Sequence, residues 1–309
     1  MKKPNGIRSV SLPAPAKINL FLAVSGIRND GFHEIFSVLA KLELHDIISI
    51  EAIPQENHLI FECVGNKQLN GVDNLVEQAV HVWREHTNVT QGFRIILDKR
   101  IPIEAGLGGG SSDAVAALIG LNSFLQDPLS FDALHSLSLM LGSDCPSFLI
   151  SGLCLVKGRG EEVSLIDGVV SDDLKEKEVL LFKPPIGFST PEIYSQLARS
   201  GAYSRSDQSL ELFFEWSKGR VSTEDFLFND LQKAVFLKHL YFAPLFKKIN
   251  SEFGLKSLLT GSGSCCFCLG KKGICWEDVK RVIQKAWGED TYLLQTRFEA
   301  NPKQSNLFS

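Results

Sequence analysis

A loop rich in glycine and serine constrains this chain more than any other segment. Residues 102–113 read Pro-Ile-Glu-Ala-Gly-Leu-Gly-Gly-Gly-Ser-Ser-Asp and lead directly into apolar residues at helical spacing. Glycines permit positive φ angles and let the backbone approach a bulky anion, while the free N–H groups of a helix N-terminus carry about half a positive charge. The junction therefore predicts a phosphate-binding loop, with a nucleotide triphosphate as the expected ligand.

Two common phosphate motifs fit this loop poorly. A Walker A loop needs Gly-Lys-Ser/Thr, and no lysine follows the glycines. A dinucleotide fingerprint needs Gly-x-Gly-x-x-Gly, but counting from Gly106 and Gly108 places Ser111 where the third glycine should be. A turn without ligand, capped by Ser111, Ser112 or Asp113, would need only one such residue and no run of glycines. A phosphate loop of another type is the better interpretation.

Composition limits the class of protein and of ligand. The 309 residues exceed one typical core and indicate two domains, and the formal net charge of -4 argues against a nucleic-acid-binding surface. Pro13 and Pro15 interrupt the apolar stretch that a signal peptide would need, and the most apolar region, 134–156, contains Asp144 and Pro146. We therefore expect a cytoplasmic protein with a small-molecule ligand, no nucleic acid and no membrane span. The oligomeric state is not indicated.

The seven cysteines are expected to be buried apolar residues rather than ligands. Cys265 and Cys268 form a Cys-x-x-Cys pair, but a structural zinc site needs a second pair of similar spacing. No metal site is predicted from these residues.

Hydrophobic periodicity predicts a mixture of strands and helices. Strands are expected over 9–26, 38–53, 93–98 and 179–182. Helices are expected over 73–84 with Asp73 as cap, over 114–125, over 191–197, and over 231–253 with a break at Pro244. A charged stretch at 165–177 indicates a boundary between an N-terminal domain, 1–168, and a C-terminal domain, 169–309. Residues 200–220 are expected to be a variable polar insert.

Three segments together resemble a known family. They are Ala-Pro-Ala-Lys-Ile-Asn-Leu-Phe-Leu at 14–22, the glycine loop, and Leu-Leu-Thr-Gly-Ser-Gly at 258–263. Their order and content resemble the GHMP kinase superfamily, small-molecule kinases whose phosphate loop has the form Pro-x-x-x-Gly-Leu-Gly/Ala-x-Ser-Ser. Gly-Phe-His-Glu at 31–34 and Leu-Gly-Ser-Asp-Cys-Pro-Ser-Phe at 141–148 are similar to the branch of that superfamily that acts on a cytidine diphosphate substrate in non-mevalonate isoprenoid biosynthesis.

The resemblance covers nearly the whole chain and implies its fold. That fold is α+β with two domains, an N-terminal domain like ribosomal protein S5 domain 2 and a ferredoxin-like C-terminal domain. ATP and the acceptor are expected to meet in the cleft between them.

The resemblance also implies catalytic residues. Asp144 matches the family aspartate in Gly-x-Asp-x-Pro, and Lys17 matches the lysine beside it. A carboxylate facing the acceptor hydroxyl can orient it and accept its proton, while an ammonium keeps the carboxylate ionised. Asn19 lies two residues beyond Lys17, on the same face of a strand, and is expected to position the same hydroxyl. Alone, this aspartate would be interpreted as a turn residue and this lysine as a solvated one.

ATP is the implied phosphoryl donor, accompanied by Mg²⁺ that neutralises the triphosphate. Lys99 and Asn74 are expected near the nucleotide, with a surface cation and a helix cap as their alternatives. No carboxylate cluster for the metal is evident. The residues expected to wrap the phosphates are Pro102, Gly106, Leu107, Gly108, Gly109, Gly110, Ser111 and Ser112.

Recognition of the cytidine is expected to depend on Phe32 and His33, one stacking on the base and the other bonding its edge. Many relatives carry Tyr at the first position, so Phe32 keeps the ring but loses a phenolic donor. Phe188 is a candidate for the opposite wall, with a core aromatic as its alternative. From the second domain, the residues expected to close the site are Thr260, Gly261 and Gly263.

The implied activity is transfer of the γ-phosphoryl group of ATP to a hydroxyl of the cytidylated substrate. A GHMP kinase for mevalonate, homoserine or a sugar would not need Phe32 and His33. A non-catalytic nucleotide-binding relative would not need Lys17 and Asp144. A dehydrogenase is a more distant alternative.

Overall fold

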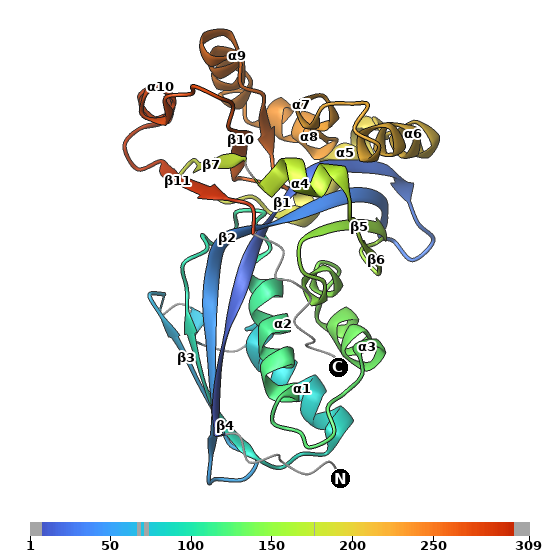
Figure 1. Ribbon diagram of the computed structural model, residues 1–309, viewed down its shortest axis with the longest axis vertical. Helices are drawn as coiled ribbons and strands as arrows, with labels where there is room; N and C mark the ends of the chain where they lie inside the picture. Colours follow the sequence, from blue (N-terminus) through green and yellow to red (C-terminus); the bar gives the residue numbers. More distant parts are fainter. Residues whose placement is uncertain (1–7, 67–68, 71–73, 176, 300–309) are drawn as a thin grey trace.

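Two β-sheets organise the computed structural model, which describes residues 8–66, 69–70, 74–175 and 177–299 (Figure 1). In the described residues the larger sheet has seven strands in the order β3-β4-β2-β1-β8, with β5 paired to β2 and β6 to β5. Its strands are β1 (Ser9–Ile27), β2 (His33–Ile53), β3 (Leu59–Val64), β4 (Gly92–Asp98), β5 (Leu153–Gly158), β6 (Glu162–Leu165) and β8 (Phe228–Asn229). The smaller sheet is antiparallel, in the order β11-β7-β10-β9. Its strands are β7 (Glu178–Lys183), β9 (Ser257–Leu259), β10 (Cys266–Leu269) and β11 (Tyr292–Arg297).

The two longest strands, β1 and β2, form the antiparallel pair on which the site is built. Their register places Lys17 opposite Lys41 and Asn19 opposite Leu39, with a register shift between Pro15 and Lys17. The strand predictions for 9–26 and 38–53 are confirmed, although β2 begins earlier, at His33. The early start places the Gly-Phe-His-Glu segment at the turn between the two strands.

Helices cover the sheets, and the glycine loop leads into the most buried of them. They are α1 (Leu75–Thr87), α2 (Gly109–Asn122), α3 (Phe131–Leu141), the 3-10 helix η2 (Cys145–Leu149), α4 (Val169–Lys175), α5 (Thr190–Ser200), α6 (Ser206–Ser217), α7 (Thr223–Phe226), α8 (Leu231–Lys238), α9 (Phe242–Phe253) and α10 (Trp276–Trp287). Figure 1 shows α2 lying between the large sheet and its neighbours α1 and α3. Val115, Leu118 and Leu121 of α2 share a core cluster with Ile48 and Ile50 of β2. This packing holds the loop at the start of α2 in a fixed place.

Two predictions about the second half of the chain are wrong. Residues 200–220 are not a polar insert, because α6 places Phe213 and Trp216 in the core. The helical region 231–253 does not break at Pro244 but at 239–241, between α8 and α9. Proline is tolerated in the first turn of a helix, where its missing N–H has no intrahelical partner, and Pro244 is the third residue of α9.

Other local predictions have separate outcomes. Asp73, predicted as a helix cap, lies outside the described residues, and Asn74 caps α1 by accepting a hydrogen bond from the Val76 backbone N–H at 2.9 Å. Six of the seven cysteines are buried and free, as expected, whereas Cys275 is exposed. No helix among the described residues is long and apolar enough to cross a membrane.

The N-terminal and C-terminal halves of the chain contribute to common buried clusters. Strand β8 pairs in parallel with β1, and Phe298, just after β11, bridges Leu42 of β2. Leu20 of β1 and Leu181 of β7 belong to the same buried cluster. The proposed boundary near residue 168 remains a prediction. Residues from both sides of that boundary are therefore held in a common frame around the site.

We predict that Trp216→Ala destabilises the protein strongly. Trp216 is fully buried and stacks on Phe226, with ring centroids 4.2 Å apart. Removing a buried tryptophan costs about 3–5 kcal/mol of the free energy of unfolding, because the cavity is only partly filled. Urea unfolding followed by circular dichroism measures the loss. On the same helix, Phe214 is 48% exposed, so Phe214→Ala is the matched control and should change stability little. Equal effects of the two substitutions would contradict the packing described for α6.

Candidate active site

A buried ammonium, that of Lys17, lies at the centre of the candidate site. The Lys17 side chain is 3% exposed, and its Nζ donates to Asn19 Oδ1 at 2.8 Å. Asp144 Oδ2 is 3.9 Å from the same Nζ. Burial lowers the pKa of Lys17, the Asp144 carboxylate raises it, and the charge of Lys41 lowers it further. Lys17, Asn19 and Asp144 are therefore brought together as a cation, an amide and an anion.

Asp144 faces solvent from the residue that precedes η2. Its side chain is 51% exposed, so the carboxylate is accessible to a ligand. Its carbonyl accepts hydrogen bonds from the Ser147 hydroxyl at 2.7 Å and the Ser147 N–H at 3.3 Å. These bonds close the turn and leave one oxygen of the carboxylate directed at Lys17.

The glycine loop passes close to Lys17 and needs its glycines for that approach. The Lys17 N–H donates to the Leu107 carbonyl at 2.9 Å. Gly106 has φ +71°, and a Cβ there would lie 2.2 Å from the Thr260 carbonyl oxygen. Gly108 has φ +70°, and a Cβ there would lie 2.7 Å from the Phe148 ring and 3.0 Å from Lys17 Cγ. A side chain at Gly106 would clash with backbone, one at Gly108 would displace the Phe148 and Lys17 side chains, and both positions have the positive φ that favours glycine.

The N-terminus of α2 fits an anionic ligand. Gly108 occupies the N-cap position and offers no side chain to bond the free N–H groups of the first turn, which contains Gly109, Gly110 and Ser111. Ser112 is buried, and its Oγ has no hydrogen-bond partner among the described residues. Uncapped N–H donors and an unsatisfied hydroxyl suit phosphate oxygens. Pro102 begins this loop, immediately after the buried Ile101.

Lys99 lies beneath the phosphate loop, held between two buried carboxylates. Its Nζ contacts Asp46 and, at 2.8 Å, Asp113 of α2. A Cβ on Gly109 would lie 2.9 Å from the same Nζ. Burial acts to lower the pKa of Lys99, but Asp113 and Asp46 raise it on balance, and burial raises the pKa of Asp113. The geometry gives Lys99 a role in fastening α2 to the sheet, beside the predicted nucleotide position.

Asn74 is placed by α1 rather than by the loop. Its amide oxygen caps α1, and its Nδ2 donates to the Leu69 carbonyl at 3.2 Å. The helix-cap interpretation describes these bonds completely. A nucleotide contact of Asn74 stays a prediction.

A cavity of about 540 Å³ opens beside Asp144 and extends to Phe32 and His33. Ser111 of the phosphate loop lines the same cavity, so phosphate loop, carboxylate and aromatic residues face one space. The residues around it are Gly31, Phe32, His33, Ile35, Ser111, Ser143, Asp144, Arg159, Thr190, Pro191, Tyr194 and Ser195. Such a volume suits a small-molecule ligand.

Phe32 and His33 line this cavity with two aromatic rings. Phe32 is 47% exposed, and the Arg159 guanidinium lies 4.9 Å from its ring centroid. His33 Nε2 is buried without a hydrogen-bond partner among the described residues. Burial lowers the pKa of His33, so the ring is neutral near pH 7. A neutral imidazole with one unsatisfied nitrogen can bond the edge of a base.

A further aromatic residue of the cavity is Tyr194, which the sequence analysis did not select. The Tyr194 ring lies 4.8 Å from the His33 ring and lines the cavity. Phe188, the predicted candidate, is 9% exposed and stacks on His239, with ring centroids 4.4 Å apart. In the sequence Tyr194 is one apolar position of a predicted helix, and no motif distinguishes it. Arg159 was also missed, because it lies in the turn between β5 and β6.

Residues 260–263 reach the site from the second half of the chain. The Asn19 N–H donates to Thr260 Oγ1 at 3.1 Å, and that hydroxyl donates to Asn19 Oδ1 at 3.3 Å. A Cβ on Gly261 would lie 3.3 Å from Lys17 Nζ, whereas one on Gly263 would lie 2.8 Å from Phe188. Thr260 therefore borders Asn19, Gly261 borders Lys17, and Gly263 packs on Phe188.

Comparison with known proteins agrees with this geometry. Residues 74–152, which contain the phosphate loop and Asp144, match the model of the GHMP kinases N terminal domain. A solved mevalonate kinase from Methanococcus jannaschii, 19% identical, has a TM-score of 0.68 over 96% of this chain and 100% of that chain, and it shows the fold. Fold and site together define a two-domain α+β GHMP kinase.

Closer relatives identify the branch of this class. The chain is 32% identical to a 4-diphosphocytidyl-2-C-methyl-D-erythritol kinase of Gloeobacter violaceus, over 94% of this chain and 95% of the relative. It is 32% identical to the Listeria welshimeri protein of the same name, over 96% of this chain and 99% of that relative. A crystal structure of a 4-(cytidine 5'-diphospho)-2C-methyl-D-erythritol kinase, 26% identical, has a TM-score of 0.71 and covers 93% of this chain and 99% of that chain. The chain belongs to the family of 4-diphosphocytidyl-2-C-methyl-D-erythritol kinases.

We predict that Lys99→Met destabilises the protein by about 3–5 kcal/mol, because Asp46 and Asp113 would remain buried without their cation. Arg100→Met is the matched control, since Arg100 pairs with Asp98 at the surface and should contribute under about 1 kcal/mol. Thermal and urea unfolding of both variants measures the difference. Similar stability of the Lys99 variant and the wild type would contradict the fastening role.

Proposed function

We propose that this chain transfers the γ-phosphoryl group of ATP to the 2-hydroxyl of 4-diphosphocytidyl-2-C-methyl-D-erythritol, giving the 2-phosphate and ADP. This reaction is a step of the non-mevalonate route to isopentenyl diphosphate. One observation carries the proposal: a single cavity is lined by Phe32 and His33, by Asp144, and by Ser111 of the phosphate loop. A substrate with a base at one end and a hydroxyl at the other fits that arrangement.

The chemistry follows from the charges around the hydroxyl. Its oxygen bonds to the γ-phosphorus while the bond from that phosphorus to the β–γ bridging oxygen breaks, and its proton passes to the Asp144 carboxylate. Lys17, 3.9 Å from Asp144, pairs with the carboxylate and stabilises the charge on the phosphoryl oxygens. Asn19 holds the Lys17 ammonium in place through its 2.8 Å hydrogen bond.

Mg²⁺ is proposed to accompany ATP and to neutralise its phosphate charge. No group of three or more His, Cys, Asp or Glu side chains suited to a metal occurs in the part of the chain that the structure describes. Such a metal would be held mainly by phosphate oxygens and water, as Mg²⁺ often is. The Ser111 and Ser112 hydroxyls, at the start of α2, are the protein oxygens that we propose lie near it.

Substrate selectivity is proposed to come from stacking and from one directed hydrogen bond. Phe32 and Tyr194 supply aromatic faces, and His33 Nε2 is the unsatisfied nitrogen for the edge of the cytosine. Arg159, held over Phe32, is a cation within reach of a diphosphate in the same cavity. Mevalonate, homoserine and sugars carry no base that could stack here. Competition of CMP or CDP with the acceptor substrate therefore separates kinases for those substrates from this function. We also propose a cytoplasmic location, because the reaction consumes ATP and the cysteines are free thiols.

We predict that Asp144→Ala lowers kcat by roughly 10²- to 10⁴-fold, the usual cost of losing a general base. The KM for ATP should change little, because Asp144 is not part of the phosphate loop. Coupled ADP-release kinetics measure both constants. Asp172→Ala, at an exposed surface ion pair, is the control that should keep wild-type rates. Near-normal turnover of the Asp144 variant would reject its catalytic role.

We predict that Phe32→Ala and Tyr194→Leu each raise the KM for the cytidylated substrate by about tenfold, because stacking of a base on an aromatic ring contributes roughly 1–3 kcal/mol. The KM for ATP should stay near its wild-type value, since the change is local to the cytidine end. Phe188→Leu is the comparison variant, because its ring packs on His239 rather than on the cavity. If Phe188→Leu raises this KM and Tyr194→Leu does not, the wall is misassigned.

A further inference from the structure

A second buried lysine, Lys41, lies directly opposite Lys17 in the β1–β2 register. It is 2% exposed, yet it does not line the substrate cavity. A buried ammonium is costly unless its hydrogen bonds are satisfied inside the protein. Its contacts therefore indicate what the residue does.

The ammonium of Lys41 contacts the segment that carries Asp144 and the strand that follows it, while its backbone carbonyl accepts from the Glu299 N–H at 3.0 Å. Its Nζ donates to the Ser147 carbonyl at 2.8 Å and lies 4.8 Å from the centroid of the Phe148 ring. The Cys154 thiol of β5 is 3.8 Å away. A hydrogen bond from a charged donor is stronger than a neutral one, so the Ser147 carbonyl is firmly held.

The two residues that Lys41 holds are connected to the reacting groups. Ser147 bonds the Asp144 carbonyl through both its hydroxyl and its N–H, at 2.7 and 3.3 Å. Phe148 packs against the space beside Gly108, where a Cβ would lie 2.7 Å from its ring. One cation thus braces the turn of Asp144 and, through Phe148, the phosphate loop.

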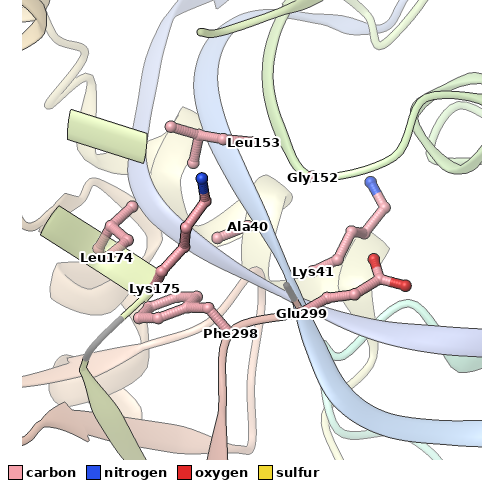
Figure 2. Close-up of a pocket in the computed structure, with 8 residues that line it drawn as sticks. All are labelled: Ala40, Lys41, Gly152, Leu153, Leu174, Lys175, Phe298 and Glu299. Atoms are coloured by element: carbon pink, nitrogen blue, oxygen red, sulfur yellow. The ribbon is translucent and has the colours of Figure 1, made fainter. Parts of the chain in front are cut away.

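The surroundings of Lys41 leave no room for a ligand of its own. Figure 2 shows it with Glu299 on one side of a small cavity, its ammonium directed away from Leu174 and Lys175. The cavity measures about 20 Å³, enough for one water molecule. Lys41 therefore acts on its protein neighbours.

We propose that Lys41 is a positioning residue, which fixes the turn of Asp144 against Lys17 and thereby sets the electrostatic potential at the Lys17 ammonium. The catalytic part of this inference rests on the proposed function. Asp144 on the turn, Cys154 on β5 and Glu299 after β11 are the titratable groups that face the two lysines.

The charges around Lys17 give the direction of the electrostatic effect. The charge of Lys41 contributes to the lowered pKa of Lys17, after burial and against Asp144. Burial raises the pKa of Glu299, while Lys41 and His45 lower it. Without Lys41 one repulsion on Lys17 disappears, but the turn of Asp144 is also released, and Lys17 then loses the larger attraction of that carboxylate. The pKa of Lys17 therefore falls, protonated Lys17 is lost at lower pH, and the alkaline decline of activity moves downward.

The test compares Lys41→Met with Lys175→Met. Lys175 lines the same small cavity but is partly exposed and pairs with Asp172, so it is the matched control. Lys41→Met should lower kcat roughly 10- to 100-fold, as a displaced catalytic group does, with the KM for both substrates within about threefold of wild type. The Lys17 Nζ signal, assigned by its loss in Lys17→Arg, should titrate at lower pH in an NMR titration of Lys41→Met, because the displaced Asp144 no longer stabilises the ammonium. Lys175→Met should change neither quantity.

Opposite results would overturn the inference. Wild-type kcat in Lys41→Met excludes a positioning role. An unchanged Lys17 titration, together with a parallel loss of stability, a lower kcat and a higher KM for both substrates, indicates that Lys41 contributes only packing. Should the Met variant not fold, Lys41→Arg and Lys41→Gln decide, since only Arg is expected to keep the Lys17 titration and kcat near wild type. If the wild type does not phosphorylate the cytidylated substrate, the proposed function fails, while the Lys17 titration still tests Lys41.

Discussion

The buried ammonium of Lys17 is the interaction on which the site depends. Its charge is removed from water, so the fold must surround it with groups that favour a cation. Asn19 does so at 2.8 Å and Asp144 at 3.9 Å, while the Leu107 carbonyl accepts from the Lys17 backbone. These three bring a strand, a turn and the glycine loop to one point. The geometry for phosphoryl transfer is therefore a consequence of how one buried charge is accommodated.

The same point joins the two halves of the chain. Thr260 shares two hydrogen bonds with Asn19, and its carbonyl lies where a Cβ on Gly106 would be. Strand β8 extends the sheet that carries Lys17, and the bridge between Leu42 and Phe298 fastens the far end of the chain beside Lys41. The site is complete only when both halves are folded, because neither half alone holds the lysine, the loop and Thr260. The second half thus contributes to the site by packing as well as by lining the cavity.

Prediction from the sequence succeeded where the signal lay in a contiguous segment. The glycine loop, its helix and the strands of Lys17 and Lys41 follow from local composition and periodicity, and the structure confirms them as elements. The presence of Tyr194 rather than Phe188 in the cavity lining did not follow, because both are aromatic positions near α5 and only the docking of that helix turns one toward the cavity. The prediction for residues 200–220 was wrong for a related reason. Many polar residues flank Trp216 in the sequence, although its ring lies in the hydrophobic core.

By itself, the sequence determined the chemistry that is available: a phosphate loop without a lysine, a lysine and an amide on one face of a strand, and an aspartate before a proline turn. These are local properties, encoded by neighbouring residues and by backbone preferences. Tertiary structure decided which of them meet, and it assigned Lys99 to two buried carboxylates and Lys41 to the turn of Asp144. The physical reason is that burial and distance set how strongly a charge interacts with its neighbours, and both depend on residues far apart in the chain.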